Sequence, residues 1–399
     1  MTETACEILI VGAGIIGMTI ARELLHKGAE EIIIIEKESD VGLHASGRNS
    51  GVLHAGIYYT PDSLKASSCI KGNRMMKQFC KERRLPLLEK GKVIVTCNES
   101  ELVILHELHR RAQLNGAKTT IIDQKELAEI EPNAKTVEKA LFSFETAQVD
   151  PKAVLQTIKH ELLESRKIKM IHRCRFRGLK GTSTAITQRG PIKFKRFINA
   201  AGAYCDLVAG AFGLASDYRL IPFKGIYRRL KSHSTCTVNG NIYPVPDIRN
   251  PFLGIHFTRN THGEVHLGPT AIPAFGRENY GLLAGADREA ASILFWDGVL
   301  FFRNPKFRSV ALSEPRKYLD YTFYQDARKL VKLLSADEIE SSPKVGIRAQ
   351  LVDWKSKEML MDFLVKIDGD AVHVLNPISP AFTCSMDLAK KIVDTYFDS

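Results

Sequence analysis

The N-terminal residues that could do chemistry are three glycines and one acid. Gly12, Gly14 and Gly17 form a G-x-G-x-x-G pattern, and Glu36 follows about 20 residues after the last glycine, at the end of the apolar run "IIII". Glycines so placed allow a tight turn, a close approach of a pyrophosphate to the backbone, and close packing of a helix on a strand. The acid can accept hydrogen bonds from ribose hydroxyls. The pattern therefore predicts a dinucleotide site.

Two observations favour a flavin over a nicotinamide dinucleotide. The chain has no second G-x-G-x-x-G pattern, which a reductase that takes electrons from a nicotinamide usually needs. A second group of small residues, Ala201 and Gly202, follows an apolar run ending at Ile198 and would let the chain return close to a bound dinucleotide. We therefore predict FAD as the cofactor.

The segment "HASGRNSGVLHAGIYY" (44–59) is a second candidate for cofactor contact. Its small polar residues and glycines supply donors that suit a pyrophosphate and the edge of a flavin ring. The residues concerned are Ser46, Gly47, Asn49, Ser50 and Gly51.

The elements that position these residues follow from hydrophobic patterning. Residues 8–35 are typical of a buried strand, a turn, a helix and a second buried strand. Residues 371–397 indicate another strand, turn and amphipathic helix. The stretches 90–98 and 222–270 alternate as antiparallel strands do. The fold class expected is α/β, with a Rossmann-like, glutathione-reductase-like FAD-binding domain and an interleaved antiparallel-sheet substrate domain.

Composition narrows the partners and the compartment. The 399 residues carry a formal net charge of +11, which favours an anionic partner, but no nucleic-acid motif or long basic block is present. We therefore expect no nucleic-acid partner. The eight cysteines show no C-x-x-C pair, which indicates free thiols in a reducing compartment. No apolar run could span a bilayer, and the first strand begins close to Met1, so a cytoplasmic protein without a signal peptide is expected.

Five blocks of the chain resemble the family of L-2-hydroxyglutarate dehydrogenases and oxidases, within the D-amino-acid-oxidase-like superfamily of FAD oxidoreductases. The most specific block is "NSGVLHAGIYYTPDSLKASSCIKGNRMMKQFC" (49–80). The others follow in the family's order and are "PFKGIYRRL" (222–230), "NIYPVPDIRNPFLGIHFTR" (241–259), "VHLGPTAIPAF" (265–275) and "VGIRAQL" (345–351). The resemblance covers most of the chain and is least clear over 276–340.

The chain departs from the family in two places. Arg48 stands where the family has histidine, which puts a fixed positive charge in place of a titratable one. The segment "NPISPAFTCSMDLAKKI" (376–392) differs from the family's Asn-Ala-Pro-Ser-Pro-Ala-Ala-Thr and its glycine-containing helix start. By resemblance, Ser379, Pro380 and Ala381 of this segment contact FAD.

The resemblance also implies a discontinuous layout. The FAD-binding domain takes residues 1–85, 140–215 and 341–399. The substrate domain takes residues 86–139 and 216–340, with a helical insertion at about 276–340.

The reaction implied is the oxidation of L-2-hydroxyglutarate, a small dicarboxylate, to 2-oxoglutarate by hydride transfer from C2 to the flavin. Such a site needs cations for the carboxylates and a base that is neutral near pH 7. His54 and His256 are the candidate bases, since an unperturbed histidine pKa is about 6.5. Arg348 matches an arginine that grips the substrate carboxylate in the superfamily, and Lys224 matches a basic position in the family.

Other interpretations remain open. An FAD-dependent oxidase of an amino acid such as glycine or sarcosine would keep the fold and need a base less. A non-catalytic flavin-binding or nucleic-acid-binding protein is supported only by the net charge. His106 and His109 have a metal-like spacing, but no third ligand is evident, so we predict no metal.

The electron acceptor is expected to be a quinone or oxygen. The most aromatic stretch, "ASILFWDGVLFFRNPKFRS" (291–309), places phenylalanines and a tryptophan beside basic residues. It fits either a helix packed on the substrate domain or a segment in peripheral contact with the inner face of a membrane, where a quinone would be reached.

Overall fold

The computed structural model describes residues 4–247, 252–286 and 288–397, and these residues divide into two compact units. The first contains residues 1–49, 151–222 and 348–399, and the second contains residues 50–150 and 223–347. Residues 248–251 of the family-like block 241–259 lie outside the described residues.

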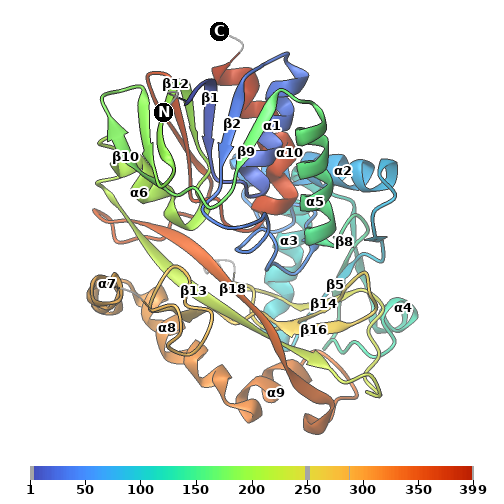
Figure 1. Ribbon diagram of the computed structural model, residues 1–399. Coiled ribbons are helices and arrows are strands. Elements are labelled where there is room, and N and C mark those ends of the chain that lie inside the picture. Colours follow the sequence, from blue (N-terminus) through green and yellow to red (C-terminus); the bar gives the residue numbers. More distant parts are fainter. Residues whose placement is uncertain (1–3, 248–251, 287, 398–399) are drawn as a thin grey trace. The chain divides into compact units, whose positions relative to one another are not determined.

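The first unit is built on an eight-stranded sheet with the strand order β10-β11-β12-β1-β2-β9 and with β20 joining β12 to β19 (Figure 1). Strands β1, β2, β9, β12 and β20 pair in parallel, as a Rossmann-like sheet requires. The strands are β1 Thr4–Val11, β2 Ile32–Ile35, β9 Ile168–Ile171, β10 Phe176–Lys180, β11 Thr184–Thr187, β12 Gly190–Asn199, β19 Leu364–Asp368 and β20 Ala371–Leu375. The helices are α1 Ile15–His26, α5 Pro151–Glu164, η2 Gly202–Tyr204, α6 Cys205–Gly210 and α10 Ala381–Tyr396.

Alternation along β1 explains why this sheet is covered on both faces. Leu9 and Val11 belong to an apolar cluster that includes Val208 of α6, while Ile8 and Ile10 point to the opposite face and are also buried. Helix α1 packs beside α5 and α10 (Figure 1). Thr19 of α1 donates a hydrogen bond to a backbone carbonyl of α10 at 3.2 Å. Burial on both faces is why the strands read as continuous apolar runs.

The second unit contains a nine-stranded sheet with the order β17-β13-β16-β15-β14-β5-β7-β6, in which β18 also pairs with β13, and a small sheet β3-β8-β4. Its strands are β3 Val52–Leu53, β4 Leu87–Leu88, β5 Lys92–Val95, β6 Thr119–Ile122, β7 Ala140–Ser143, β8 Ala147–Val149, β14 Asn241–Pro244, β15 His256–Arg259, β16 Val265–Gly268 and β17 Ile272–Pro273. Strands β13 Tyr218–Leu230 and β18 Ile339–Asp353 have residues in both units.

The helices of the second unit lie between these strands along the chain. They are α2 Leu64–Glu82, η1 Glu99–Glu101, α3 Leu102–Leu114, α4 Gln124–Ile130, α7 Ala290–Arg303, α8 Pro305–Ser313, η3 Glu314–Tyr318, α9 Asp320–Arg328 and η4 Ala336–Glu338. The segment 276–340 is therefore rich in helix, as its sequence predicts.

The units differ from the predicted domain boundaries at four segments, of which residues 216–222 group with the first unit and residues 341–347 with the second. Residues 50–85 and 140–150, expected in the FAD-binding domain, group with the second unit. The reason is strand pairing inside that unit, because β3 pairs with β8, β8 pairs with β4, and β7 pairs with β5. The predicted layout, which the family resemblance implies, stays a prediction as far as cofactor contact is concerned.

Candidate active site

The turn between β1 and α1 is shaped by its glycines. Gly12 has φ +109°, and a Cβ there would lie 2.4 Å from the carbonyl oxygen of Ala200. A Cβ on Gly17 would lie 2.0 Å from the carbonyl oxygen of Gly12. Gly14 is the residue before α1 and has no side chain to cap the helix. The turn thus brings the N-terminus of α1 close to the sheet, where backbone N–H groups favour an anion.

Glu36 lies directly after β2, beside the same turn. One carboxylate oxygen accepts a hydrogen bond from the N–H of Ala13 at 3.0 Å, and the other accepts one from the N–H of Glu38 at 3.0 Å. These bonds hold the acid where a ribose can donate to its remaining lone pairs. The glycine turn and the fixed acid together fit the phosphate and ribose parts of FAD.

The polar segment 44–49 folds against this turn within the first unit. The hydroxyl of Ser46 accepts a hydrogen bond from the N–H of Ile15, the first residue of α1, at 3.0 Å. The side-chain amide of Asn49 donates to the carbonyls of Ala45 and Ser46 at 3.2 and 2.7 Å. Arg48 donates from Nε to the carbonyl of Leu43 at 2.6 Å. Ser46 and Asn49 thus fix the segment, and Arg48 is anchored within it.

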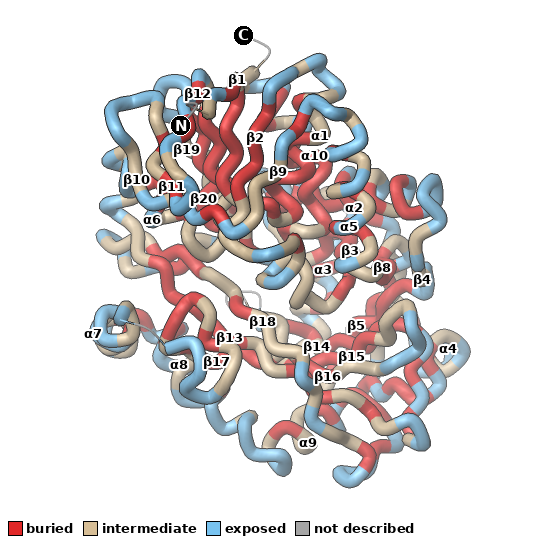
Figure 2. Tube along the Cα trace, in the orientation of Figure 1, coloured by how far each residue is buried: buried red, intermediate tan, exposed pale blue. Residues whose placement is uncertain are grey.

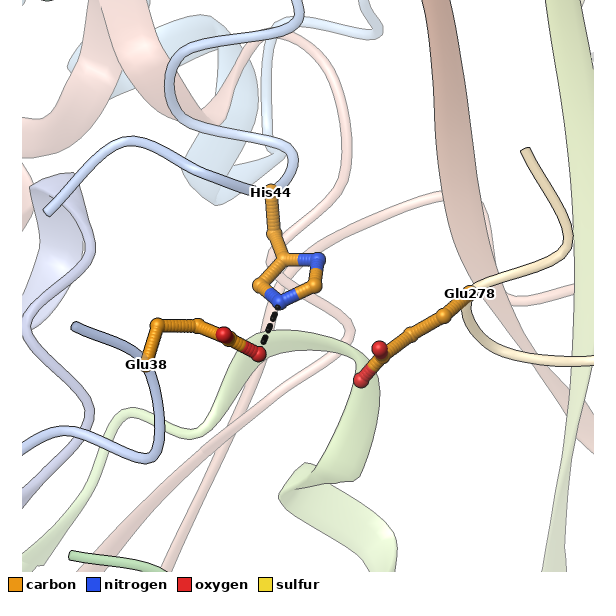
Figure 3. Close-up of side chains that lie close together, drawn as sticks. All are labelled: Glu38, His44 and Glu278. Atoms are coloured by element: carbon orange, nitrogen blue, oxygen red, sulfur yellow. Dashed lines mark hydrogen bonds and ion pairs between the residues drawn. The ribbon is translucent and has the colours of Figure 1, made fainter. Parts of the chain in front are cut away.

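A charged group follows β2 in the same unit. His44 Nε2 lies 2.9 Å from a carboxylate oxygen of Glu38 (Figure 3). Lys37 forms an ion pair with that carboxylate. The lysine and the histidine hold the pKa of Glu38 at about 2, against the opposing effect of burial. Figure 3 also draws Glu278, which belongs to the second unit. The pair of Glu38 and His44 fixes the start of the polar segment.

Two further segments of the first unit carry predicted cofactor contacts. Ala201 donates its N–H to the side chain of Asn199 at 3.2 Å, and Gly202 has φ +57° at the start of η2. Ser379 and Pro380 precede α10, which begins at Ala381. The glycine turn meets the first segment directly, since Ala200 limits the space at Gly12.

Arg348 lies in the part of β18 that belongs to the first unit. Its guanidinium donates from Nε and Nη2 to the side-chain oxygen of Gln350, at 3.3 and 3.2 Å. Gln350 is fully buried and in turn donates to the carbonyls of Leu351 and Leu360. A buried amide thus orients the guanidinium.

In the second unit, one face of the nine-stranded sheet is apolar and the other carries both apolar and polar side chains. Register places Val93, Ile242 and Phe257 side by side on one face, where they pack in a hydrophobic cluster with α4 and α9. Because side chains alternate along a strand, Lys92 and His256 belong to the opposite face. That face is also buried, so its polar groups are withdrawn from water.

Tyr58, Tyr243 and His256 form a cluster with Lys92. The Lys92 ammonium lies 4.6 Å from the ring centroid of Tyr58 and 4.8 Å from that of Tyr243. The ring of His256 stacks on Tyr243 with a centroid distance of 3.8 Å. His256 Nδ1 lies 2.9 Å from the carbonyl oxygen of Gly254.

Burial and positive charge keep both histidines neutral. Burial lowers the pKa of His54 well below 6.5, and the charges of Lys92 and His256 lower it further. Burial lowers the pKa of His256 to about 3, with an opposing hydrogen bond to Gly254 and a further decrease from Lys92. Burial also lowers the pKa of Lys92, to about 7. Each histidine can therefore accept a proton at neutral pH.

The backbone carrying His54 and Tyr58 is held by two buried amides. Asn73 of α2 donates to the carbonyls of Leu53 and His54, at 3.1 and 3.0 Å. Asn115 donates to the carbonyls of Gly56 and Tyr59, at 2.7 and 3.0 Å. The segment is therefore fixed on both sides of its functional side chains.

The structure brings together some of the predicted site residues and not others. Lys92 lowers the pKa of both His54 and His256, and His256 also lowers the pKa of His54, so the three residues share one cluster. Lys224 is engaged elsewhere in the second unit, where its ammonium donates to the side chain of Asn279 at 3.1 Å and to the carbonyl of Gly281 at 2.7 Å. Its place as a ligand for substrate stays a prediction. Ser50 and Gly51 group with the second unit, where the carbonyl of Gly51 accepts a hydrogen bond from Val149.

Lys92 is the functional candidate that the sequence did not single out. It stands at the start of "KVIV" in an alternating strand, where a lysine is usually solvated. The sequence indicated only that a lysine begins an apolar strand. The aromatic residues that surround Lys92 come from distant segments and could not be predicted from this pattern. His109, the metal candidate set aside, contacts Thr119 through Nδ1 at 2.9 Å.

The fold and the glycine turn define an FAD-binding oxidoreductase, and comparison with known proteins agrees. The family model described as FAD dependent oxidoreductase matches residues 7–365. The chain belongs to this family, and FAD is therefore its cofactor.

Curated relatives are similar over nearly the whole chain. The L-2-hydroxyglutarate dehydrogenase of Indibacter alkaliphilus is 34% identical, covering 97% of this chain and 98% of that protein. The mitochondrial L-2-hydroxyglutarate dehydrogenases of Nematostella vectensis and Homo sapiens are 34% and 32% identical, covering 97% and 98% of this chain and 90% and 89% of those proteins.

Solved structures share the fold at low identity. The L-α-glycerophosphate oxidase of Mycoplasma pneumoniae with FAD bound has a TM-score of 0.75 at 20% identity, over 98% of this chain and 95% of that chain. A glycine oxidase of Geobacillus kaustophilus has a TM-score of 0.71 at 16% identity, over 99% and 95%. The predicted α/β fold is confirmed.

Proposed function

We propose that this enzyme oxidises L-2-hydroxyglutarate to 2-oxoglutarate. The observation that carries the proposal is the buried cluster of His54, His256 and Lys92, which offers proton acceptors beside a cation. Among the residues that the structure describes, no carboxylate is a cause of the pKa shift of any of these three groups. Such a cluster suits an anionic hydroxy acid, and the relatives named above carry that activity in their names.

The chemistry divides between the cofactor and the chain. When bound, FAD supplies a two-electron acceptor for the hydride that leaves C2 of the substrate. The hydroxyl proton leaves to a neutral histidine, His54 or His256, and the C2–O bond becomes a carbonyl. Arg348 binds a carboxylate through its guanidinium, which Gln350 orients. The glycine turn, Glu36, Ser46 and Asn49 would hold the cofactor.

Anaerobic reduction of the purified holoenzyme tests the substrate. We expect L-2-hydroxyglutarate to bleach the flavin absorbance, and the D-enantiomer, glycine and sarcosine to do so far more slowly. Fast bleaching by glycine or sarcosine, with none by L-2-hydroxyglutarate, would establish the amino-acid oxidase instead. A purified protein without flavin would refute both.

The proton acceptor is tested by replacing each histidine with glutamine, which keeps a polar side chain but has no basic nitrogen. We expect one of His54→Gln and His256→Gln to slow flavin reduction by roughly 10²–10⁴-fold, the usual contribution of a general base. His160→Gln, on the exposed side of α5, is the control. Unchanged reduction in both variants would remove the histidines from the reaction.

We further propose that electrons pass to a quinone and that α7 contacts the membrane that holds it. None of the described helices is long and apolar enough to cross a bilayer. Phe295 and Phe302 on α7 are 67% and 78% exposed, and Arg303 and Lys306 beside them are also exposed (Figure 2). Ile293 and Leu300 face inward and anchor the helix. Aromatic side chains can enter the acyl boundary while cations meet anionic headgroups.

Co-sedimentation with anionic vesicles tests this contact. We expect Phe295→Ser/Phe302→Ser to lose vesicle binding while keeping its flavin. Val103→Ser/Leu114→Ser on α3 is the matched control, because those side chains are similarly exposed. Failure of the wild-type enzyme to bind such vesicles at physiological salt would contradict the proposal and favour oxygen as the acceptor.

A further inference from the structure

We propose that Lys92 and Tyr58 form the subsite that binds the substrate carboxylate farther from the hydroxyl group. This inference rests on the proposed function, which makes the substrate a five-carbon dicarboxylate. It adds Lys92, which lies outside the family-like sequence blocks, gives a role to Tyr58 of the block 49–80, and predicts selectivity for a dianion.

The first support is the state of the Lys92 ammonium. Lys92 is 1% exposed, and its Nζ has no hydrogen-bond partner among the described residues. A lysine withdrawn from water normally finds an acceptor, because a buried polar group without one costs free energy. Here its neighbours are the faces of Tyr58 and Tyr243, which attract a cation but accept no strong hydrogen bond. The ammonium therefore keeps its three donors for a group that the protein itself does not supply.

The second support is the Tyr58 hydroxyl, which is also buried and also without a hydrogen-bond partner among the residues described. Burial raises its pKa well above 10, so it remains a donor. A protonated phenol and an ammonium in one cluster offer donors only. A carboxylate, with two oxygens that only accept, is the complementary group.

The other buried cations of this unit are already engaged. Lys224 donates to Asn279 and Gly281. Arg228 and Arg277 form ion pairs with Asp320 and Glu289. Lys92 differs from these three in having no hydrogen-bond acceptor within the part of the chain that the structure describes.

Lys92 and His256 are both neighbours of the Tyr243 ring. Both residues pack against the ring of Tyr243, with His256 at 3.8 Å between ring centroids and the ammonium at 4.8 Å from the centroid. The ammonium and the imidazole are not hydrogen bonded to each other. The first carboxylate of the substrate is attached to the carbon that bears the hydroxyl, whereas the second lies three carbons further on. We assign the second carboxylate to Lys92, because the proposed function gives Arg348 one carboxylate and leaves the other without a ligand.

Binding of two unreactive acids tests the subsite without turnover. Glutarate carries two carboxylates and pentanoate carries one on a chain of the same length. Their dissociation constants are measured by calorimetry and by perturbation of the flavin spectrum of the holoenzyme. We expect Lys92→Met to weaken glutarate binding by roughly 10- to 100-fold and Tyr58→Phe by about 3- to 10-fold, the usual worth of charged and neutral hydrogen bonds. Pentanoate binding should change less than about twofold.

Three controls keep the result interpretable. Lys92→Arg should retain much of the preference for glutarate, because it keeps the charge. Lys90→Met removes an exposed lysine of the same segment and should change nothing. Lys92→Met should not lower the unfolding temperature, since it removes a buried charge that has no counter-ion.

Two results would overturn the subsite. One is glutarate binding in Lys92→Met within twofold of wild type. The other is an equal loss for glutarate and pentanoate, which would place Lys92 at the carboxylate next to the hydroxyl. Failure of the proposed function gives a different pattern, because wild type would then bind glutarate but L-2-hydroxyglutarate would not reduce the flavin.

Discussion

At the scale of single residues, the chemistry of this enzyme depends on which buried groups carry charge. His54 and His256 are neutral because they are buried near another cation, so they can take up the proton that an alcohol must lose. Burial lowers the pKa of Lys92 to about 7, so its charge changes near neutral pH. Neutral bases beside a cation are an arrangement that attracts an acid anion and then deprotonates its hydroxyl.

Gly14→Glu is expected to give a protein without flavin. A Cβ at this position would already lie 3.1 Å from the Ser46 hydroxyl, and the added carboxylate would repel a pyrophosphate from the N-terminus of α1. The ratio of flavin absorbance to protein absorbance measures the loss. Gly210→Glu adds the same charge at an exposed, sterically open glycine of the same unit and should keep full flavin content. Normal flavin in Gly14→Glu would show that the pyrophosphate lies elsewhere.

Arg348→Lys is expected to weaken substrate binding without unfolding the enzyme. A lysine cannot reproduce the two-donor edge of a guanidinium, and a lost hydrogen bond to a charged partner is worth about 1.5–3 kcal/mol, or tenfold or more in KM. The measurement is steady-state kinetics together with the unfolding temperature. Arg177→Lys, at an exposed position of β10, is the control. A KM equal to that of wild type would exclude Arg348 from the site.

At the scale of elements, the sequence predicted those features that depend on residues close together in the chain. The glycine turn of residues 12–17 and the buried strands β1 and β2 were predictable because a turn, an apolar run and an acid lie within one short stretch. Lys92 could not be found in this way. Its aromatic neighbours Tyr58 and Tyr243 are brought to it by pairing between β5 and β14 and by the segment after β3, and no sequence period records those contacts.

Lys224 was named from the sequence, but its hydrogen-bond partners were not. Its resemblance to a basic family position made it a substrate ligand by expectation, whereas the folded chain gives it Asn279 and Gly281 as acceptors. Which acceptor a buried lysine finds depends on a loop more than fifty residues away, at sequence separations of 55 and 57. A sequence pattern gives the residue type but not its partner.

In the proposed membrane contact, the titration of Asp297 on α7 makes vesicle binding depend on pH. Burial raises the pKa of Asp297 to about 7, and one of its oxygens has no hydrogen-bond partner among the described residues. Asp297 is therefore neutral below this pH and negative above it. A negative charge on α7 opposes anionic headgroups, so vesicle binding should increase as the pH falls from 8 to 6.

Asp297→Asn should bind vesicles equally well over this range, because an amide does not titrate. The measurement is co-sedimentation at constant ionic strength, with Asp326→Asn on α9, a partly exposed position, as the control. A pH dependence that persists in Asp297→Asn would assign the titration to another group.

At the scale of the whole molecule, the pH profile of the enzyme should follow from the two kinds of buried group. The histidines are neutral throughout the range from pH 6 to 9, because their pKa values are lowered. Lys92, with a pKa of about 7, loses its proton within that range. The titratable groups around it are Tyr58, Cys69, Tyr243, His54 and His256. None of these groups is a carboxylate that would stabilise the protonated form of Lys92. The charge of Lys92 therefore changes between pH 6 and 9.

The catalytic efficiency should therefore fall above neutral pH. If a protonated Lys92 is required to bind the dianion, kcat/KM decreases by about tenfold per pH unit once the pH exceeds the pKa of Lys92 in the free enzyme. An arginine remains charged over the whole range, so Lys92→Arg should have a lower but nearly flat kcat/KM from pH 6 to 9. Lys92→Met should also be flat, at the level to which wild type falls at high pH, because both then lack the charge. Measurement of kcat/KM with L-2-hydroxyglutarate in the three enzymes, at constant ionic strength, separates these cases. A wild-type profile that is constant across this range, or an alkaline decrease that Lys92→Arg retains, would mean that the ammonium does not control substrate capture.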